Sequence, residues 1–288
     1  MTLPAAPSTP GGAIEPRSRA RRAGGPVRPA KRRPSGWRHS LISVLAFLAV
    51  LAAWQGIVVG FHVPVYLAPS PLMVVRALRA ESHTLLVNTW PTLIETVGGF
   101  IVGNLVAIVA AVGFVHNRTF RQSVYPLAVT VRTLPIVAIS PILVLLLGNG
   151  YAPKIAIAAL ITFFPTLVNM ADGLTAVDPQ ALELMHVLSA SRWEVFRYLR
   201  WPTSLPYLFS ALRIASTASL LGAIVGEWIG SNSGLGYLIV AATYDYRTPL
   251  LYATMAVASA LALALFGAIS ILERYAISWR QPSGVGAD

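Results

Sequence analysis

Apolar residues gather in six stretches of the chain, each long enough to cross a membrane as a helix. A helix needs about 20 predominantly apolar residues to span the hydrocarbon core of a bilayer. Apolar and polar residues do not alternate with a period of two within the stretches, which argues against a membrane barrel. The pattern predicts an all-α membrane protein with about six transmembrane helices. The predicted spans are residues 41–60, 91–115, 124–147, 153–171, 207–230 and 249–272.

Prolines interrupt two of the predicted spans. Pro135 and Pro141 lie in the third, and Pro165 lies in the fourth. Membrane helices tolerate proline where neighbouring groups take up the freed backbone carbonyls, so we expect the helical spans to persist.

Small residues recur at every fourth position in the second and fifth spans. Such stripes allow two helix backbones to approach closely. They predict a packed seam, either within one chain or between two copies of it. The stripes are Gly99 and Gly103; Ala211, Ala215 and Ser219; and Ala218, Gly222, Gly226 and Gly230.

The composition excludes several classes of protein. Hydrophobic residues make up 55% of the chain and charged residues 11%, whereas about 25% of a soluble domain is charged. This balance argues against a soluble globular enzyme, and a disordered scaffold would be polar and rich in charge. Because the chain has no cysteine, disulfides, thiolate metal sites and cysteine nucleophiles are excluded.

The sequence also lacks the common signatures of a catalytic site. It contains no G-x-x-x-x-G-K-[ST] phosphate loop, no H-E-x-x-H and no G-x-G-x-x-G. The five histidines show no spacing typical of metal ligands. We therefore expect neither an enzyme nor a bound metal or cofactor. If the protein does work that requires energy, the energy must come from an ion gradient or from a partner protein.

Most of the net charge of +11 lies in the first 40 residues, which contain nine basic residues and one acidic residue. Residues 1–38 lack apolar periodicity and are predicted to be a disordered basic tail. A basic tail can bind nucleic acid or anionic lipid. Because an apolar span follows at once, a solvated tail that fixes membrane orientation is favoured, with no nucleic-acid partner.

Lysine and arginine residues concentrate on the cytoplasmic side of membrane proteins. If the N-terminus is cytoplasmic, 16 of the 22 lysines and arginines fall on that side and four on the other. Both termini are therefore predicted to be cytoplasmic, including a short C-terminal tail at residues 281–288.

Lys154, at the edge of the fourth predicted span, is assigned to the outer side. Four further charged residues lie within the predicted spans. Glu95 and Glu227 are placed near the outer membrane surface, where hydration costs little. Arg132 and Arg213 lie closer to the cytoplasmic side, where long side chains can reach water. Pairing between helices is the favoured role for these residues. A role of Glu95, Arg132 or Glu227 in a transport pathway is the alternative.

The loop at residues 172–206 is predicted to contain two short helices. Asp178 caps the first, Pro179 opens it, and the spacing places Leu182, Met185 and Leu188 on one of its faces. Ser191 and Glu194 form a capping box that starts the second helix. A turn at Ser189-Ala190 joins the two, and Pro202 and Pro206 are expected to end the second helix. The hairpin could pack against its own bundle or dock a cytosolic partner, and the residues themselves leave both open.

This loop resembles the EAA motif of ABC importer permeases of the type I, binding-protein-dependent class. The motif reads E-A-A, three residues, G, nine residues, I, one residue, L-P. The chain has Glu183-Leu184-Met185, then Ser189, then Leu199, then Trp201-Pro202, with matching spacing. Leucine and methionine replace the two alanines, serine replaces glycine, and tryptophan replaces the leucine before the proline.

Further blocks resemble the permeases for aliphatic sulfonates, taurine and nitrate. The core of the resemblance covers residues 85–275 within a permease domain at 39–280. The matching blocks are Tyr66-Leu67-Ala68-Pro69-Ser70-Pro71; Arg132-Thr133-Leu134-Pro135 with Pro141 and Gly148-Asn149-Gly150; and Glu227 with Gly234-Leu235-Gly236-Tyr237.

The resemblance implies a permease in the cell membrane that provides the pathway for a small solute. It implies three kinds of protein partner: ATP-binding cassette ATPase subunits, an extracytoplasmic solute-binding protein and a second copy of the permease. The substrate would be of the sulfonate, taurine or nitrate type, or alternatively a thiamine-precursor pyrimidine or riboflavin. Two alternatives from other functional classes are a stand-alone secondary carrier and a membrane anchor. The resemblance implies that Glu183 is a cap or salt-bridge partner within the loop. The residues implied to couple to the ATPase are Glu183, Leu184, Met185, Leu188, Ser189, Ala190, Ser191 and Pro202.

Overall fold

The computed structural model describes residues 36–277, with side chains described except at residues 36–40, 131 and 132. The predicted tail 1–38 lies outside the described residues except for its last three, which begin a helix, and the tail 281–288 lies wholly outside them. The chain divides into two compact units, Met1–Ala49 and Val50–Asp288. The first unit contains the N-terminal part of the first helix, and the second contains the remaining described elements.

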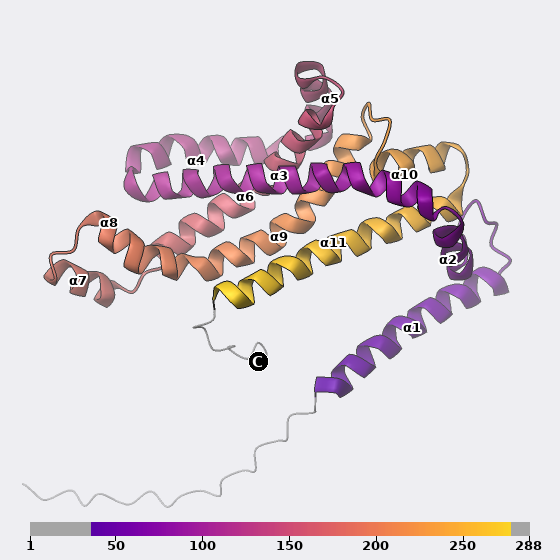
Figure 1. The fold of residues 1–288 in the computed structure, drawn as a ribbon, viewed down its shortest axis with the longest axis horizontal. Helices are drawn as coiled ribbons and strands as arrows, with labels where there is room; N and C mark the ends of the chain where they lie inside the picture. The colour runs from indigo at the N-terminus through magenta and orange to yellow at the C-terminus, as the bar shows by residue number, and fades with distance from the viewer. Residues whose placement is uncertain (1–35, 278–288) are drawn as a thin grey trace, which may run out of the picture. The chain divides into compact units, whose positions relative to one another are not determined.

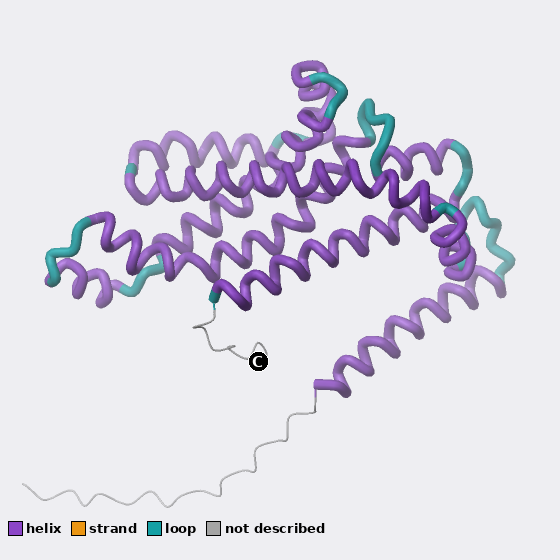
Figure 2. The backbone as a smooth tube through the Cα atoms, viewed as in Figure 1, coloured by secondary structure: helices purple, strands orange, loops and turns teal. Residues whose placement is uncertain are grey.

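The described residues form helices and connecting loops, with no strand among them (Figure 2). This confirms the prediction of an all-α membrane protein. The helices are α1 (Gly36–Gly60), α2 (Pro71–Ala80), α3 (Ser82–His116), α4 (Arg118–Thr133), α5 (Ile136–Leu147), α6 (Tyr151–Thr175), α7 (Pro179–Val187), α8 (Arg192–Val195), the π-helical turn η1 (Phe196–Arg200), α9 (Trp201–Glu227), α10 (Leu235–Tyr244) and α11 (Thr248–Ala276).

Within the described part of the chain, five helical stretches are long and apolar enough to cross a membrane. They coincide with the first, second, fourth, fifth and sixth predicted spans. The third differs, because the chain breaks between Thr133 and Ile136 and forms two shorter helices, α4 and α5. Pro135 adopts an extended conformation at the start of α5. Because proline has no backbone N–H to donate within a helix, it favours this break over an uninterrupted helix. The short apolar helix α10 was not predicted.

Three long helices, α3, α6 and α9, form the centre of the second unit (Figure 1). The predicted stripes of small residues lie where these helices meet. A side chain added at Gly99 or Gly103 would collide with Ala158, Ala159 or Thr162 of α6, and one added at Gly222 would meet the backbone of Ala158. The stripes therefore form a seam within one chain, as small residues do between membrane helices.

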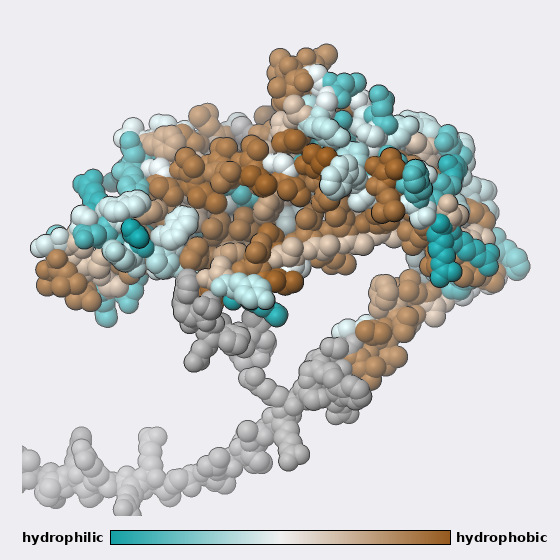
Figure 3. Space-filling view, viewed as in Figure 1, coloured by the Kyte–Doolittle hydropathy of each residue, from teal (hydrophilic) through white to brown (hydrophobic). Residues whose placement is uncertain are grey.

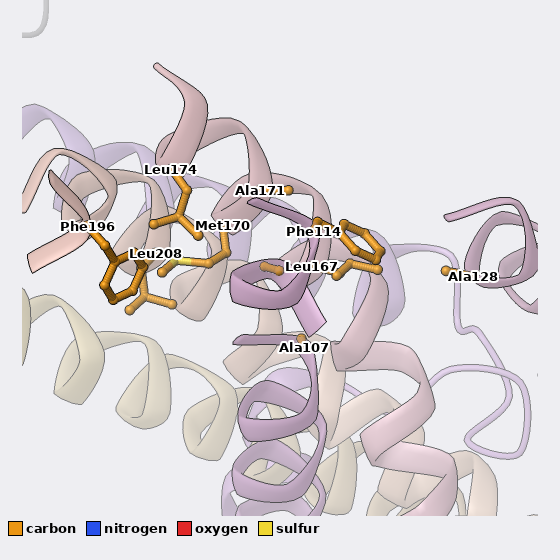
Figure 4. Packing of buried hydrophobic residues seen from close by; sticks show 10 residues of the cluster. Ala107, Phe114, Ala128, Leu167, Met170, Ala171, Leu174, Phe196 and Leu208 are labelled. Carbon is orange, nitrogen blue, oxygen red and sulfur yellow. The ribbon is translucent and has the colours of Figure 1, made fainter. Parts of the chain in front are cut away.

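The largest cluster of buried apolar residues lies toward the end of the bundle formed by the C-terminal part of α3, by η1 and by the start of α9. Figure 4 shows its packing. Side chains from α3, α4, α6, η1 and α9 meet there, including Phe114, Leu167, Met170, Phe196 and Leu208. This is also the end where α3 passes into α4 and where α7 and α8 project (Figure 1). The cluster therefore supports the base of the predicted two-helix loop.

The outer surface of the bundle is apolar over much of its length (Figure 3). In α11 only 6% of the most apolar window is buried, although its mean hydropathy is 2.3. A soluble protein does not leave so large an apolar surface in water. The surface is that of a protein whose solvent is lipid.

Candidate functional site

The start of the first loop helix and the turn after it are built as the sequence predicts. The Asp178 side chain accepts a hydrogen bond from the Gln180 N–H (2.9 Å) and caps α7. Ser189 follows in a left-handed conformation, with φ of 54°, and the Ala190 N–H closes the turn on the Met185 carbonyl (2.9 Å). Left-handed residues commonly end helices in this way. The backbone thus reverses between α7 and α8 at Ser189-Ala190.

A capping box starts α8. The Ser191 N–H donates to a Glu194 carboxylate oxygen (2.7 Å), and the Glu194 N–H donates to the Ser191 hydroxyl (3.3 Å). Two N–H groups that the helix would leave unpaired are thereby satisfied. The direction in which α8 leaves the turn is fixed by these two bonds.

The expectation that Pro202 and Pro206 end this second helix is wrong. Helical structure continues from Arg192 through η1 and α9 to Glu227. Pro202 lies in the first turn of α9, directly after the wider π-helical turn, where a missing N–H is tolerated. The hydroxyl groups of Thr203 and Ser204 donate to the carbonyls of Leu199 and Trp201 (2.7 and 2.8 Å). The second helix of the loop is therefore the beginning of a membrane-spanning helix.

The two faces of α7 differ from the expected arrangement. The spacing predicted Leu182, Met185 and Leu188 on one face. In the structure Leu188 is 66% exposed, together with Leu184 (59%) and Val187 (79%), whereas Leu182 and Met185 are half-buried. Figure 3 shows this apolar surface on α7 at the end of the bundle. Glu183 is exposed and makes no hydrogen bond or ion pair with the described residues, although the resemblance implied a cap or salt bridge.

A second polar site lies at the opposite end of the bundle and corrects a prediction. Glu95 and Glu227 are each 1% exposed, so neither is close to water. Lys154 Nζ lies 3.7 Å from Glu95 Oε1 and is itself buried. This lysine was assigned to an outer loop, but α6 begins at Tyr151 and carries it into the bundle. The ion pair compensates part of the cost of burying the carboxylates.

Hydrogen bonds from two elements, α3 and α10, hold the Glu227 carboxylate. The Thr92 hydroxyl donates to Oε1 (2.6 Å), and the Gly236 N–H donates to Oε2 (2.5 Å). Asn88 and Thr92 also accept bonds from the N–H groups of Gly234 and Leu235 (2.9 and 2.8 Å). Charge-assisted bonds of this kind stabilise a buried carboxylate. The site therefore ties α3, α6, α9 and α10 together.

Gly234 is needed at this site for two reasons. Its φ is +111°, a conformation that residues with a side chain rarely adopt, and an added Cβ would collide with the Glu227 carboxylate. The sequence pairing of Glu227 with Gly234-Leu235-Gly236 thus has a direct structural basis.

The remaining predicted charges have separate places. Arg213 forms an ion pair with Glu273 (2.7 Å), so the predicted interhelical pairing is confirmed for this arginine and for Glu95. Arg132 lies near the end of α4, and its side chain is outside the described part of the structure. The structure does not bring Arg213 to the buried carboxylates.

The sequence profile described as "Binding-protein-dependent transport system inner membrane component" matches residues 103–278, more than half of the chain. The chain belongs to this family, and it is a multi-pass permease subunit of an ABC importer.

Curated relatives cover most of the chain. The formylaminopyrimidine transport permease protein ThiX of Halalkalibacterium halodurans is 32% identical over 244 residues, which are 84% of this chain and 97% of that protein. The riboflavin transport system permease protein RibX of Chloroflexus aurantiacus is 32% identical over 237 residues, 82% and 88% of the two chains. The putative aliphatic sulfonates permease SsuC of Bacillus subtilis is 26% identical over 253 residues, 86% and 90%.

The fold is also similar to that of a solved transporter. An inward-facing structure of the MetNI methionine ABC transporter matches with a TM-score of 0.59 and 15% sequence identity, covering 68% of this chain and 97% of that chain. This likeness supports the fold alone.

Proposed function

We propose that this permease works in a complex with ATP-binding cassette ATPase subunits, a second copy of itself and an extracytoplasmic solute-binding protein. The observation that carries the proposal is the projecting α7–α8 pair, whose outer face is apolar although it lies at the end of the bundle. Leu184, Val187 and Leu188 are exposed at positions i, i+3 and i+4 of one helix. Amphipathic helices dock through such a stripe into a groove of a partner.

The distribution of charge supports a cytoplasmic position for α7 and α8. More of the described arginines lie at the end of the bundle that carries α7 and α8 than at the other (Figure 1). Positive charge marks the cytoplasmic side, where the ATPases would bind. The start of α4 (Arg118, Arg121), α8 and η1 (Arg192, Arg197, Arg200) and the end of α11 (Arg274) lie toward α7. The helix α2 (Arg76, Arg79) and the residue before α11 (Arg247) lie toward the other end.

The first test is retention of co-expressed candidate ATPase subunits during purification of the permease in detergent. We expect the double substitution Leu184→Asp/Leu188→Asp to reduce the retained ATPase by about tenfold or more, because apolar anchors at the centre of an interface carry most of its energy. The matched control is Tyr244→Asp, which changes a 79% exposed side chain in α10 at the far end.

Equal retention by the double variant and the control would contradict the proposed role of α7. Solute uptake by the permease alone, driven by an ion gradient without ATPase subunits, would instead support a secondary carrier.

For the substrate, we propose a small nitrogen heterocycle of the formylaminopyrimidine or riboflavin type. Relatives named for such solutes are 32% identical to the chain, whereas the one named for aliphatic sulfonates is 26% identical. A cavity of about 220 Å³ between α4, α5 and α6 has an apolar described lining that includes Phe163 and Phe164. Planar aromatic solutes suit such a surface better than a sulfonate anion does. The cavity is a candidate part of the pathway.

The substrate proposal is tested by uptake into proteoliposomes that hold the permease with its ATPase and binding protein. We expect ATP-dependent uptake of labelled riboflavin or a formylaminopyrimidine, and reduced uptake after Phe163→Ala because the stacking surface is lost. Exchange of Leu263 of α11, which is exposed on the bundle surface, for alanine is the control. Uptake of taurine or an alkanesulfonate in place of the heterocycles would establish the sulfonate alternative that SsuC suggests.

A further inference from the structure

A cavity of about 380 Å³ lies between the loop helices and the C-terminal end of α3. Four basic side chains line it: His116 from α3, His186 from α7, Arg192 from α8 and Arg200 from η1. These residues come from segments up to 84 positions apart in the chain. A local sequence motif therefore could not predict the cavity.

No carboxylate lines this cavity among the described residues. The Glu194 carboxylate accepts a hydrogen bond from the Ser191 N–H, and the Asp178 carboxylate accepts one from the Gln180 N–H. Arg200 donates one hydrogen bond to the Leu174 carbonyl (3.2 Å), and a guanidinium group has five N–H donors. Arg192 forms no ion pair with the described residues. The cavity therefore presents positive charge and hydrogen-bond donors that the surrounding protein does not neutralise.

The cavity is separate from the surface proposed to contact the ATPase. Leu182, His186 and Ala190 line it, and Leu182 and His186, four residues apart, lie on one side of α7. The exposed Leu184, Val187 and Leu188 lie on another side. A partner that covers the outer leucines would leave the cavity behind α7.

We propose that this cavity binds the phosphate group of an anionic organic molecule, either a phospholipid headgroup or a soluble phosphate ester. Arginine binds phosphate through paired, charge-assisted hydrogen bonds, and two arginines face the same space. The volume falls in the range of cavities that hold small organic ligands. Phe196, which stacks on Trp193 and meets His116 edge to face, supplies an apolar wall for the rest of the molecule.

The proposal is tested by calorimetric titration of the purified permease in a neutral detergent. One arm uses dihexanoylphosphatidic acid and the second uses glycerol 3-phosphate, and these two anionic molecules are the phosphate-bearing probes meant below. Dihexanoylphosphatidylcholine, whose phosphate charge is balanced by choline, is the net-neutral control. We expect saturable binding of at least one phosphate-bearing probe, weakened about tenfold by Arg192→Gln because one charged hydrogen-bonding partner is lost. Binding of the lipid alone identifies a headgroup site, and binding of glycerol phosphate identifies a site for soluble esters.

The matched control variant is Arg197→Gln. Arg197 lies in the same segment and carries the same charge, but its guanidinium lies over Tyr198 and does not line the cavity. We expect this variant to bind like the wild type. Equal loss of affinity in Arg192→Gln and Arg197→Gln would show attraction by general surface charge and overturn the site. Absence of saturable binding of both phosphate-bearing probes to the folded wild type would overturn it as well.

Discussion

Replacement of Lys154 by methionine is expected to lower the free energy of unfolding of the permease by about 3–5 kcal/mol, the usual cost of removing one partner of a buried ion pair. Glu95 and Glu227 are both buried, and Lys154 is the cation that the structure places beside Glu95. Without it, two carboxylates would share an interior with no opposite charge. The measurement is reversible unfolding in mixed detergent, followed by helical circular dichroism.

Two further variants separate lost charge from lost packing. Adding Glu95→Gln to Lys154→Met removes one unpaired carboxylate and should recover part of the lost stability. Arg79→Met, which removes an exposed cation from α2, should leave stability close to that of the wild type. If Lys154→Met unfolds like Arg79→Met, the buried ion pair has no stabilising role.

Replacement of Gly103 by leucine should destabilise the bundle by about 3 kcal/mol or more, at the upper end of what overpacking costs. A Cβ at this position would lie 2.5 Å from the Ala159 carbonyl oxygen and 2.9 Å from its Cα. Backbone atoms cannot move aside as a flexible side chain can, so α3 and α6 would have to separate. The same unfolding assay measures the loss.

Gly267→Leu is the matched control, because Gly267 of α11 has no atom within 4 Å of an added Cβ. The Gly103→Ala variant should fall between wild type and Gly103→Leu, since it adds a single carbon at the same contact. Equal stability of the two leucine variants would show that α3 and α6 do not depend on their close approach.

Much of the fold follows from local signals in the sequence. The stripe at Gly99 and Gly103 predicted a close helix contact, and the structure provides it in α6. The capping box at Ser191 and Glu194 and the turn at Ser189 were predicted from neighbouring residues and are present. Each of these features depends on atoms only a few positions apart, or on a size requirement that a single residue type satisfies.

The errors arise where distant residues decide the outcome. The burial of Glu227 depends on Thr92 and Gly236, and Lys154 reaches Glu95 from another helix. Hydropathy alone places a carboxylate near water, because the partners that allow burial lie on other elements. The available signal for a buried ion pair was Lys154, which starts an apolar stretch with no acidic residue near it in the sequence. Pro202 was taken as a helix stop because the sequence does not reveal the π-helical turn before it.

The continuous helical segment Arg192–Glu227 has the two-helix loop at one end and the buried Glu227 carboxylate at the other. Its 36 residues extend over roughly 50 Å at the rise of an α-helix. A rigid tilt of about 10° around its midpoint would displace each end by roughly 4 Å in opposite directions. The π-helical turn at Phe196–Arg200 interrupts the regular α-helical geometry near one end of this segment, and we expect the segment to bend there. If α7 and α8 contact the ATPase as proposed, a force applied at Ser191 would reach Glu227 only to the extent that this turn stays stiff.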